Sequence, residues 1–371
     1  YYKYSTMRRI TNLFLCVLLF CVSCTSTHDD TCEMVEYDHT DIKESFPLSS
    51  FVDKVETVRL ELPEPYFFGG VGNILFDESG IYINDSKQEV IYRFDANGIF
   101  LNTIGKRGEG PEEYVELSSH FLGEKSIYVS DRNSRKIHEY TFNGEYIGTI
   151  SYPFELLYNY IMALPNGNFL CHTVDGFLNG HGVWILNRQG EMEKTVLSIP
   201  EKYPFRRCGW NTMALQADGR IQIYDAPVGV FYLFDPKDES IKKVLRHKSN
   251  FKMTGDFVGQ ELNSIINESY ADGGWVLNGD RYLFSVWSLP ETDHLYYTLY
   301  DKKTKKSETC NFPELDVPGV FSFHFWKSSN LPNTWVSYVG DEYMEMCFPE
   351  KRDELHMSER TLFVYKLIFK R

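Results

Sequence analysis

Short runs of alternating apolar and polar residues recur along the chain, and Gly, Asn or Asp residues separate them. Ile81–Asp85 and Ile127–Asp131 are two such runs, and they lie 46 residues apart. Runs of this length, rich in Ile, Val and Tyr, predict short β-strands. The same spacing aligns Asn97-Gly98 with Asn143-Gly144. Glycine provides the positive φ angle that a two-residue hairpin turn requires, so we expect two-residue hairpins at both places.

Weaker copies of this unit continue towards the C-terminus at Leu186–Glu191, Ile221–Asp225 and Tyr282–Val286. A unit of four strands in about 40 to 50 residues is typical of a propeller blade. Residues 51–371 have room for about six such units. The pattern therefore predicts an all-β fold, a six-bladed β-propeller of four-stranded antiparallel blades with less than about a tenth helix. Only Phe257–Ile266 has a helical period.

The two ends of this region have strand character without being full copies of the unit. Val55–Leu60 precedes the first copy, and Thr361–Phe369 ends as a long apolar strand. Strands from both ends of a propeller commonly complete one blade, because the closed ring then has no exposed sheet edge. We expect these two segments to pair.

The first residues predict export. Arg8 and Arg9 precede the apolar run Leu13–Val22, which is shorter than the roughly 20 residues that span a bilayer. The run ends at Cys21-Val22-Ser23-Cys24, which resembles a bacterial lipobox. The resemblance implies that Cys24 is lipidated, and it divides the chain into three parts. We expect a signal peptide at 1–23, with 1–6 upstream of the true start Met7, a lipid-anchored tether at 24–50, and the propeller at 51–371.

The polar stretch Thr25–Asp30 partly resembles the acidic signals that send Bacteroidota lipoproteins to the cell surface. We therefore expect a cell-envelope, outer-membrane lipoprotein, either periplasmic or surface-exposed. The chain has 52 Asp and Glu against 38 Lys and Arg, a formal net charge of -14. Such a surface repels nucleic-acid phosphates and anionic lipids. We expect no nucleic-acid partner and attachment to the membrane through the lipid anchor only.

The cysteines and histidines form no recognised metal or catalytic motif. The five cysteines after Cys24 are widely spaced, contain no C-x-x-C pair and leave the disulfide state open: Cys32, Cys171, Cys208, Cys310 and Cys347. No G-x-S-x-G elbow and no H-E-x-x-H helix occurs. We expect no cofactor and no metal.

A glycine-rich loop follows the first repeat. Gly108, Gly110, Pro111, Glu113 and Tyr114 form a G-x-G-P-x-E-Y loop, and no Lys-Ser/Thr follows it as in a P-loop. We interpret it as a tight crossing between blades. With residues 51–150 around it, this loop resembles the six-bladed β-propeller lipoprotein family of Bacteroidota, relatives of the NHL and TolB-like propellers. From 150 onwards only the architecture is similar, so the resemblance implies the fold and leaves the activity open.

Asp85, Asp131, Asp175 and Asp225 recur at the ends of equivalent strands, where propeller symmetry would place them in a ring. Such an Asp usually accepts hydrogen bonds from its own turn, which we favour over the alternative of Ca²⁺ ligation. A zinc site from His172, Asp175 and His181 is a further alternative, and a solvated polar loop is favoured over it.

Variable chemistry in a propeller belongs in the loops that join the middle strands of a blade and the loops that join blades, since both open at one face. These loops predict a rim of basic and aromatic residues, and Trp210, Trp287 and Trp326 are expected in loops rather than strands. The predicted ligand-binding residues are Arg107, Glu113, Arg132, His172, Asp175, His181, Arg206, Arg207, Trp210, Trp287, His324 and Trp326.

The function favoured by this rim is a binding module for a glycan, a peptide or an envelope protein partner, in a monomeric protein. An anionic or amphipathic ligand would suit it, because Arg binds carboxylate bidentately and indoles stack. One alternative is a propeller enzyme, a glycan lyase or hydrolase or a metal-dependent lactonase or lyase, acting at the channel mouth. Another is a structural scaffold in the envelope.

Overall fold

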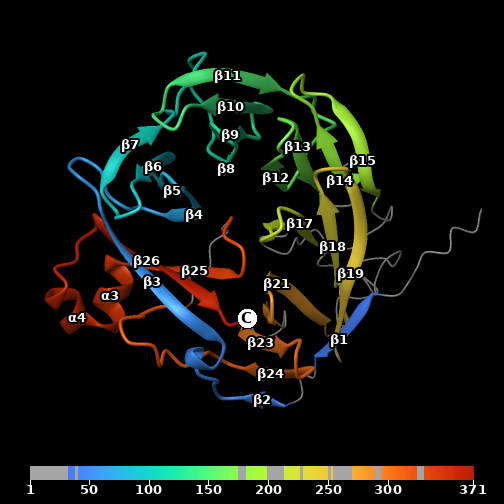
Figure 1. The fold of residues 1–371 in the computed structure, drawn as a ribbon. Coiled ribbons are helices and arrows are strands. Elements are labelled where there is room, and N and C mark those ends of the chain that lie inside the picture. Colours follow the sequence, from blue (N-terminus) through green and yellow to red (C-terminus); the bar gives the residue numbers. More distant parts are fainter. Residues whose placement is uncertain are drawn as a thin grey trace, which may run out of the picture. The chain divides into compact units, whose positions relative to one another are not determined.

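The computed structural model describes residues 32–37, 41–173, 181–198, 213–225, 229–249, 252–253, 270–288, 294–323 and 330–371. The chain divides into two compact units, Tyr1–Glu33 and Met34–Arg371. In the second unit, the described strands form six small sheets around a common axis (Figure 1). The predicted all-β, six-bladed propeller is therefore confirmed.

The first three blades each have four strands, and every strand pairs antiparallel with the next one in sequence. The first strand of each lies near the centre of the ring and the fourth lies at its circumference (Figure 1). Their strands are β4 (Val71–Asp77), β5 (Gly80–Asp85), β6 (Val90–Phe94) and β7 (Phe100–Ile104); β8 (Ser119–Leu122), β9 (Ile127–Asp131), β10 (Lys136–Tyr140) and β11 (Tyr146–Ser151); and β12 (Tyr160–Ala163), β13 (Phe169–His172), β14 (His181–Leu186) and β15 (Met192–Ser198).

The fourth and fifth blades carry extra strands from the N-terminal segment. The fourth contains β16 (Met213–Leu215), β17 (Ile221–Asp225), β18 (Val230–Asp235), β19 (Ser240–Ser249) and, at its outer edge, β1 (Glu33–Tyr37). The fifth contains β20 (Lys252–Met253), β21 (Tyr270–Asn278), β22 (Tyr282–Ser288), β23 (Leu295–Asp301), β24 (Lys306–Cys310) and β2 (Ile42–Lys43), which runs parallel to β24. The folded region thus begins before Phe51, where the sequence analysis starts the propeller. Val35, Phe46 and Leu48 explain the difference, because all three are buried.

The sixth blade joins the two ends of the propeller. It contains β25 (Thr334–Gly340), β26 (Thr361–Phe369) and β3 (Val52–Glu61), in that order. β26 and β3 are antiparallel, with Val364 opposite Val58 and Leu367 opposite Val55. The predicted pairing of these terminal segments is confirmed. Phe51, just before β3 and next to the 3-10 helix η1 (Leu48–Ser50), is fully buried against Phe284 and Phe369.

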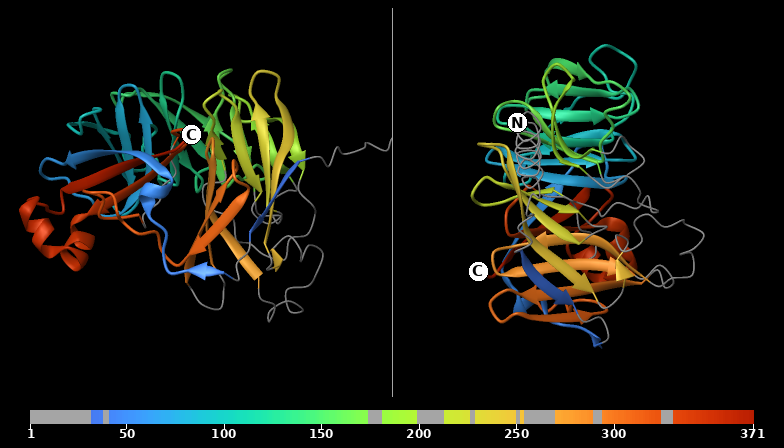
Figure 2. Two further views of the ribbon diagram at one scale, coloured as in Figure 1. Left: turned by 60° about the horizontal axis from the view of Figure 1, so that its bottom comes forward. Right: turned by 90° about the vertical axis from the view of Figure 1, so that its right-hand side faces the viewer.

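Two short helices that the sequence analysis did not predict interrupt the sixth blade. α3 (Asp341–Cys347) and α4 (Pro349–Glu354) connect β25 to β26 and lie outside the ring of strands (red in Figures 1 and 2). The helix expected at 257–266 lies outside the described residues. No helix that the structure describes is long and apolar enough to cross a membrane.

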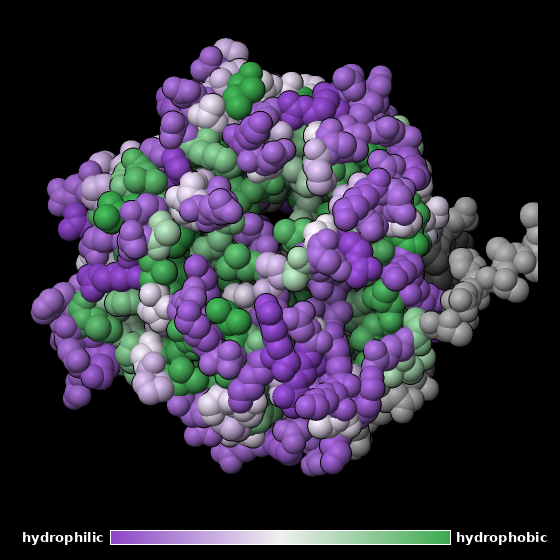
Figure 3. Space-filling model, in the orientation of Figure 1, coloured by the Kyte–Doolittle hydropathy of each residue, from purple (hydrophilic) through white to green (hydrophobic). Residues whose placement is uncertain are grey.

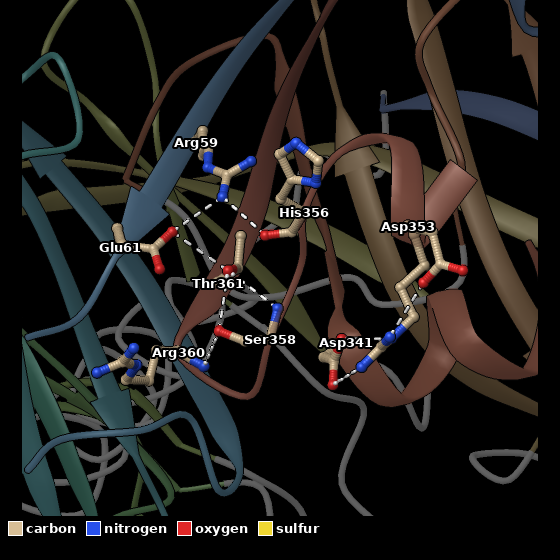
Figure 4. A network of polar contacts seen from close by, with 9 residues as sticks. Arg59, Glu61, Asp341, Asp353, His356, Ser358, Arg360 and Thr361 are labelled. Carbon is tan, nitrogen blue, oxygen red and sulfur yellow. Dashed lines mark hydrogen bonds and ion pairs between the residues drawn. The ribbon is translucent and has the colours of Figure 1, made fainter. Parts of the chain in front are cut away.

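Arg59 on β3 fixes this insertion to the closing strands. Its guanidinium donates to the carbonyl oxygen of Leu355 (2.5 Å). It also donates to the carbonyl oxygen of His356 (3.2 Å) and pairs with Glu61 (3.1 Å) (Figure 4). Within the insertion, Arg352 bridges Asp341 and Asp353. The helices are therefore held to the blade at their C-terminal end.

The core lies between neighbouring blades. Residues alternate along each strand, so each blade buries one set of side chains against the blade before it and the other set against the blade after it. Tyr82 and Ile104 of the first blade pack with Val129 and Tyr140 of the second. The ring is hollowed near its centre, where hydrophobic and polar residues both reach the surface (Figure 3). Functional side chains are accordingly expected at strand ends and in loops.

The hairpin turns differ from the predicted two-residue form. Gly98 donates to the carbonyl of Asp95 (3.1 Å), and Asp95 donates to the carbonyl of Ile99 (2.9 Å). Gly98 has a φ of 89° and Asn97 is not in the positive-φ region. This is a three-residue loop in which a single left-handed glycine follows a tight turn, and the register of β6 and β7 shifts beside it.

Candidate functional site

Two kinds of loop meet at one face of the propeller, as the sequence analysis assumed. The loops between middle strands and the loops between blades approach each other there, and we call this side the loop face. Its described loops in the first three blades are 62–70, 86–89, 105–118, 132–135 and 152–159. The hairpins that join first to second and third to fourth strands lie at the opposite ends of the strands.

Asp85, at the end of β5, joins the two kinds of loop. Its carboxylate accepts the backbone N–H groups of Gly69 (2.6 Å) and Gly70 (3.0 Å) in the inter-blade loop. It also accepts the N–H groups of Lys87 (3.0 Å) and Gln88 (2.9 Å) in its own turn. The prediction that Asp85 accepts hydrogen bonds from its own turn is confirmed. Its bonds to the inter-blade loop are a second role that the sequence analysis did not predict.

The second and third blades repeat this device with different residues. Asp131 accepts the N–H groups of Val115 (2.8 Å) and Ser134 (3.0 Å). In the third blade Thr173 takes the equivalent position. Its hydroxyl donates to the carbonyl of Leu157 (3.0 Å) in the inter-blade loop. Leu157 lies 16 residues before Thr173, and Val115 likewise lies 16 residues before Asp131. The sequence analysis had placed Asp175 in this ring, and Asp175 lies outside the described residues.

The glycine-rich loop is a cross-bonded connection between the first two blades. Gly108 donates to the carbonyl of Tyr114 (3.0 Å), and Tyr114 donates to the carbonyl of Lys106 (3.1 Å). The buried Tyr114 hydroxyl donates to the carbonyl of Glu89 (2.9 Å). These bonds confirm that the loop is a tight crossing between blades.

Arg107 and Glu113 both serve this loop. Arg107 pairs with the carboxylate of Glu89. Glu113 accepts the N–H of Gly110 (3.0 Å) and pairs with Lys106 (3.1 Å), and these two contacts lower the pKa of Glu113. Both predicted residues lie on the loop face, and both are engaged in holding the loop.

Two other predicted residues are buried. His172 ends β13 with 2% of its surface exposed, and burial lowers the pKa of its imidazole to about 3. Trp287 lies within β22, where its indole N–H donates to Thr298 (2.9 Å) and its ring stacks on Tyr296. The expectation that Trp287 lies in a loop was wrong, because the apolar run Tyr282–Ser288 continues as a strand through it.

Arg132 is exposed on the loop face, and His181 begins β14. The remaining predicted residues lie outside the described part of the chain: Cys24, Asp175, Arg206, Arg207, Trp210, His324 and Trp326.

Three residues that sequence reasoning missed lie near Arg132: Val115 is bonded to the neighbouring Asp131, Arg135 belongs to the same turn, and Phe154 lies beside Arg135. We call Val115, Arg132, Arg135 and Phe154 the Arg–Phe patch. Phe154 is 64% exposed, and the Arg135 guanidinium lies 5.3 Å from its ring centroid. Val115 is 45% exposed and is tied by its N–H to Asp131, next to Arg132. The patch is an exposed aromatic and basic surface between the second and third blades.

One sequence signal could have revealed this patch. Phe154 follows Pro153 in a connection between two strands, where a large apolar residue has no strand partner, and a turn with two arginines precedes it. The separation of 19 residues between Arg135 and Phe154 hides the contact until β10 and β11 are paired, with Lys136 opposite Ser151.

Comparison with known proteins identifies the family. The family model described as Domain of unknown function (DUF4934) matches residues 34–362. The chain belongs to this family. A search of curated proteins found no match.

Two solved structures share the fold of this DUF4934 chain. A predicted exported protein of Bacteroides fragilis NCTC 9343 has a TM-score of 0.70 at 16% identity, over 91% of this chain and 100% of that one. A member of the DUF4221 family from Bacteroides vulgatus ATCC 8482 has a TM-score of 0.53 at 12% identity, over 86% of this chain and 97% of that one. At these identities the likeness shows the fold.

Buried ionisable groups near strand ends are the remaining chemical feature of this DUF4934 chain. Asp225 ends β17, is 6% exposed, and accepts no hydrogen bond from any residue that the structure describes. Burial raises the pKa of its carboxyl to about 7. Alternate residues of a strand lie on the same face, so Asp225 shares a face with Ile223, and His172 shares a face with Leu170. Ile223 and Leu170 pack in the layer between the third and fourth blades, and Asp225 and His172 therefore face this layer too. Within the described ranges, no group of three or more His, Cys, Asp or Glu could hold a metal ion.

Proposed function

We propose that this DUF4934 protein is an exported, lipid-anchored cell-envelope protein whose loop face binds a glycan, a peptide or a protein partner. The observation that carries the binding role is the Arg–Phe patch. Its two arginines have no carboxylate within 4.0 Å among the described residues, and Phe154 leaves most of its ring in solvent. An exposed aromatic beside arginines without a carboxylate partner suits recognition of a ligand.

The rigid loops beneath the patch support the same role. Asp131 and the glycine-rich loop fix the backbone of the second blade by several hydrogen bonds. A preorganised surface loses little conformational entropy when it binds. Export is supported by the signal-like N-terminus and by the fold shared with a predicted exported Bacteroides protein.

Lipidation can be tested separately from binding. Replacing Cys24 with Ala should release the protein from the membrane fraction, because Cys24 follows the apolar run directly. The measurement is fractionation of cells after labelling with a fatty acid. Unchanged labelling and membrane recovery of Cys24→Ala would rule out this anchor.

Binding is tested on glycan and peptide arrays with the wild-type protein and the double variant Arg132→Ala/Phe154→Ala. The wild type should bind a ligand that the variant loses, while the melting temperatures agree within a few degrees, because surface substitutions usually cost less than about 0.5 kcal/mol. A variant that binds every wild-type ligand unchanged would place the binding site elsewhere, and a wild type that binds nothing would remove the binding role.

A further inference from the structure

The Arg–Phe patch is held in place before any ligand arrives. The N–H of Arg132 donates to the hydroxyl of Ser118 (3.2 Å), and the N–H of Tyr152 donates to the carbonyl of Arg135 (3.1 Å). Asp131 closes the turn between the two arginines through Ser134. The backbone on both sides of the patch is therefore fixed, and its side chains project from set positions.

Phe154 offers a flat apolar surface. The ring is 64% exposed, and Arg135 lies over it at a cation–π distance. The guanidinium limits how far the ring can turn, while the rest of the ring remains open to solvent. A ligand with one flat apolar face could stack there and remove that surface from water.

Arg132 and Arg135 have no carboxylate partner among the described residues, although acidic side chains outnumber basic ones by 52 to 38. Three other arginines each pair with a carboxylate: Arg107, Arg188 and Arg281. Arg93 and Arg246 also lack a carboxylate partner in the described part of the chain, but the arginines of the patch lie in a turn beside an exposed aromatic ring. An unpaired arginine in an acidic protein is a site for an external oxyanion, and its planar fork matches a carboxylate.

The placement of the patch argues against a peptide as the ligand. Peptides commonly add to a free strand edge, fill a groove with a helix, or lie in an aromatic-lined groove as polyproline helix. The four side chains of the patch project from turns and loops at strand ends, and a peptide that added to the free outer edge of β11 would use backbone groups of that strand rather than these side chains. A dianionic phosphate would be repelled more strongly than a single carboxylate by a chain of net charge -14.

We propose that the Arg–Phe patch binds a carboxylate-bearing saccharide, with the carboxylate on Arg132 and the apolar face of a sugar ring on Phe154. This inference rests on the proposed binding function and narrows its ligand class. It separates the two contributions: charge recognition belongs to Arg132, and stacking belongs to Phe154.

The test compares oligogalacturonate with its methyl ester, two probes that share the sugar rings and differ in charge. The purified full-length protein in detergent is titrated with each by calorimetry. The acid should bind at least about tenfold more tightly than the ester, because hydrogen bonds to a charged group are lost in the ester. Arg132→Ala should lower the affinity for the acid by a similar factor and leave the affinity for the ester unchanged. Phe154→Ala should lower the affinity for both probes.

Matched controls lie on hairpins at the opposite strand ends. Arg220 is in the turn between β16 and β17, and Ile99 is 63% exposed in the turn between β6 and β7. Arg220→Ala and Ile99→Ala should leave both affinities unchanged. Arg132→Lys keeps the charge but loses the planar fork, so its affinity for the acid should fall between those of the wild type and Arg132→Ala. This variant replaces Arg132→Ala if Arg132→Ala does not fold.

The outcomes separate this inference from the proposed function. Equal binding of acid and ester by the wild type would overturn carboxylate recognition and leave a binding module in place. Binding of poly-glutamate with no binding of either saccharide would overturn the saccharide class. Failure of every probe, here and on the arrays, would overturn the proposed function itself.

Discussion

Replacing Asp85 with Ala should lower the free energy of unfolding by about 3 kcal/mol or more. Four backbone N–H groups, those of Gly69, Gly70, Lys87 and Gln88, would lose a charged acceptor that is fully buried. A buried donor left without a partner costs roughly 1–3 kcal/mol, and although these four bonds are only partly buried, all of them are lost together. The measurement is urea denaturation of wild type and variant.

Asp95 provides the matched control. Its carboxylate also accepts backbone N–H groups, those of Asn97 (2.9 Å) and Ile99 (2.8 Å), but it lies in an exposed turn where water can replace it. Asp95→Ala should therefore cost about 1 kcal/mol. If both variants lost the same stability, the link between the inter-blade loop and β5 would have no special role.

Sequence reasoning succeeded where the fold depends on local alternation. The repeat at Ile81–Asp85 and Ile127–Asp131 was visible because each blade uses the same strand pattern, and these segments are β5 and β9. The terminal strands were recognisable for the same reason. Each strand in these predictions is visible from the alternation of neighbouring residues alone.

Apart from the hairpin turns, the errors arose where a distant contact decides the structure. β1 and β2 are short, and they become strands only because β19 and β24 offer an outer edge. Thr173 escaped notice because its role is defined by Leu157 in another loop rather than by residue type. The helices α3 and α4 have seven and six residues, too few to show a clear period.

The sequence predicted the face on which some candidate residues lie, but not the contacts that these residues make. Arg107, Glu113 and Arg132 lie on the loop face as expected, yet two of them hold the glycine-rich loop. Phe154 and Arg135 were missed, since exposure of a loop residue depends on how the blades pack around it. Side-chain type alone cannot separate an exposed aromatic from a core one, as Trp287 illustrates.

Asp225 and Asp131 end equivalent strands, but their carboxylates differ in what surrounds them. Asp131 accepts two backbone N–H groups, and Asp225 accepts none from the described residues. In an unfolded chain an Asp titrates near pH 3.9, whereas burial raises the pKa of Asp225 in the folded protein to about 7. Between these pH values the folded state keeps a proton that the unfolded chain releases. Stability should therefore fall as the pH rises from about 4 to about 7, and stay low above that.

Replacing Asp225 with Asn should remove this loss. The variant should match the wild type near pH 4 and exceed its unfolding free energy by up to about 4 kcal/mol at pH 8, as measured by urea denaturation at both pH values. Asp131→Asn is the control and should lose stability at both, because it weakens an acceptor that two N–H groups use. A loss of stability in Asp225→Asn at pH 8 would mean that the carboxylate is charged and paired. A gain in stability of Asp225→Asn at pH 8 would mean that the wild-type protein keeps the Asp225 carboxyl beside the loop face at a cost in stability. Proteins keep such destabilising groups where function requires them.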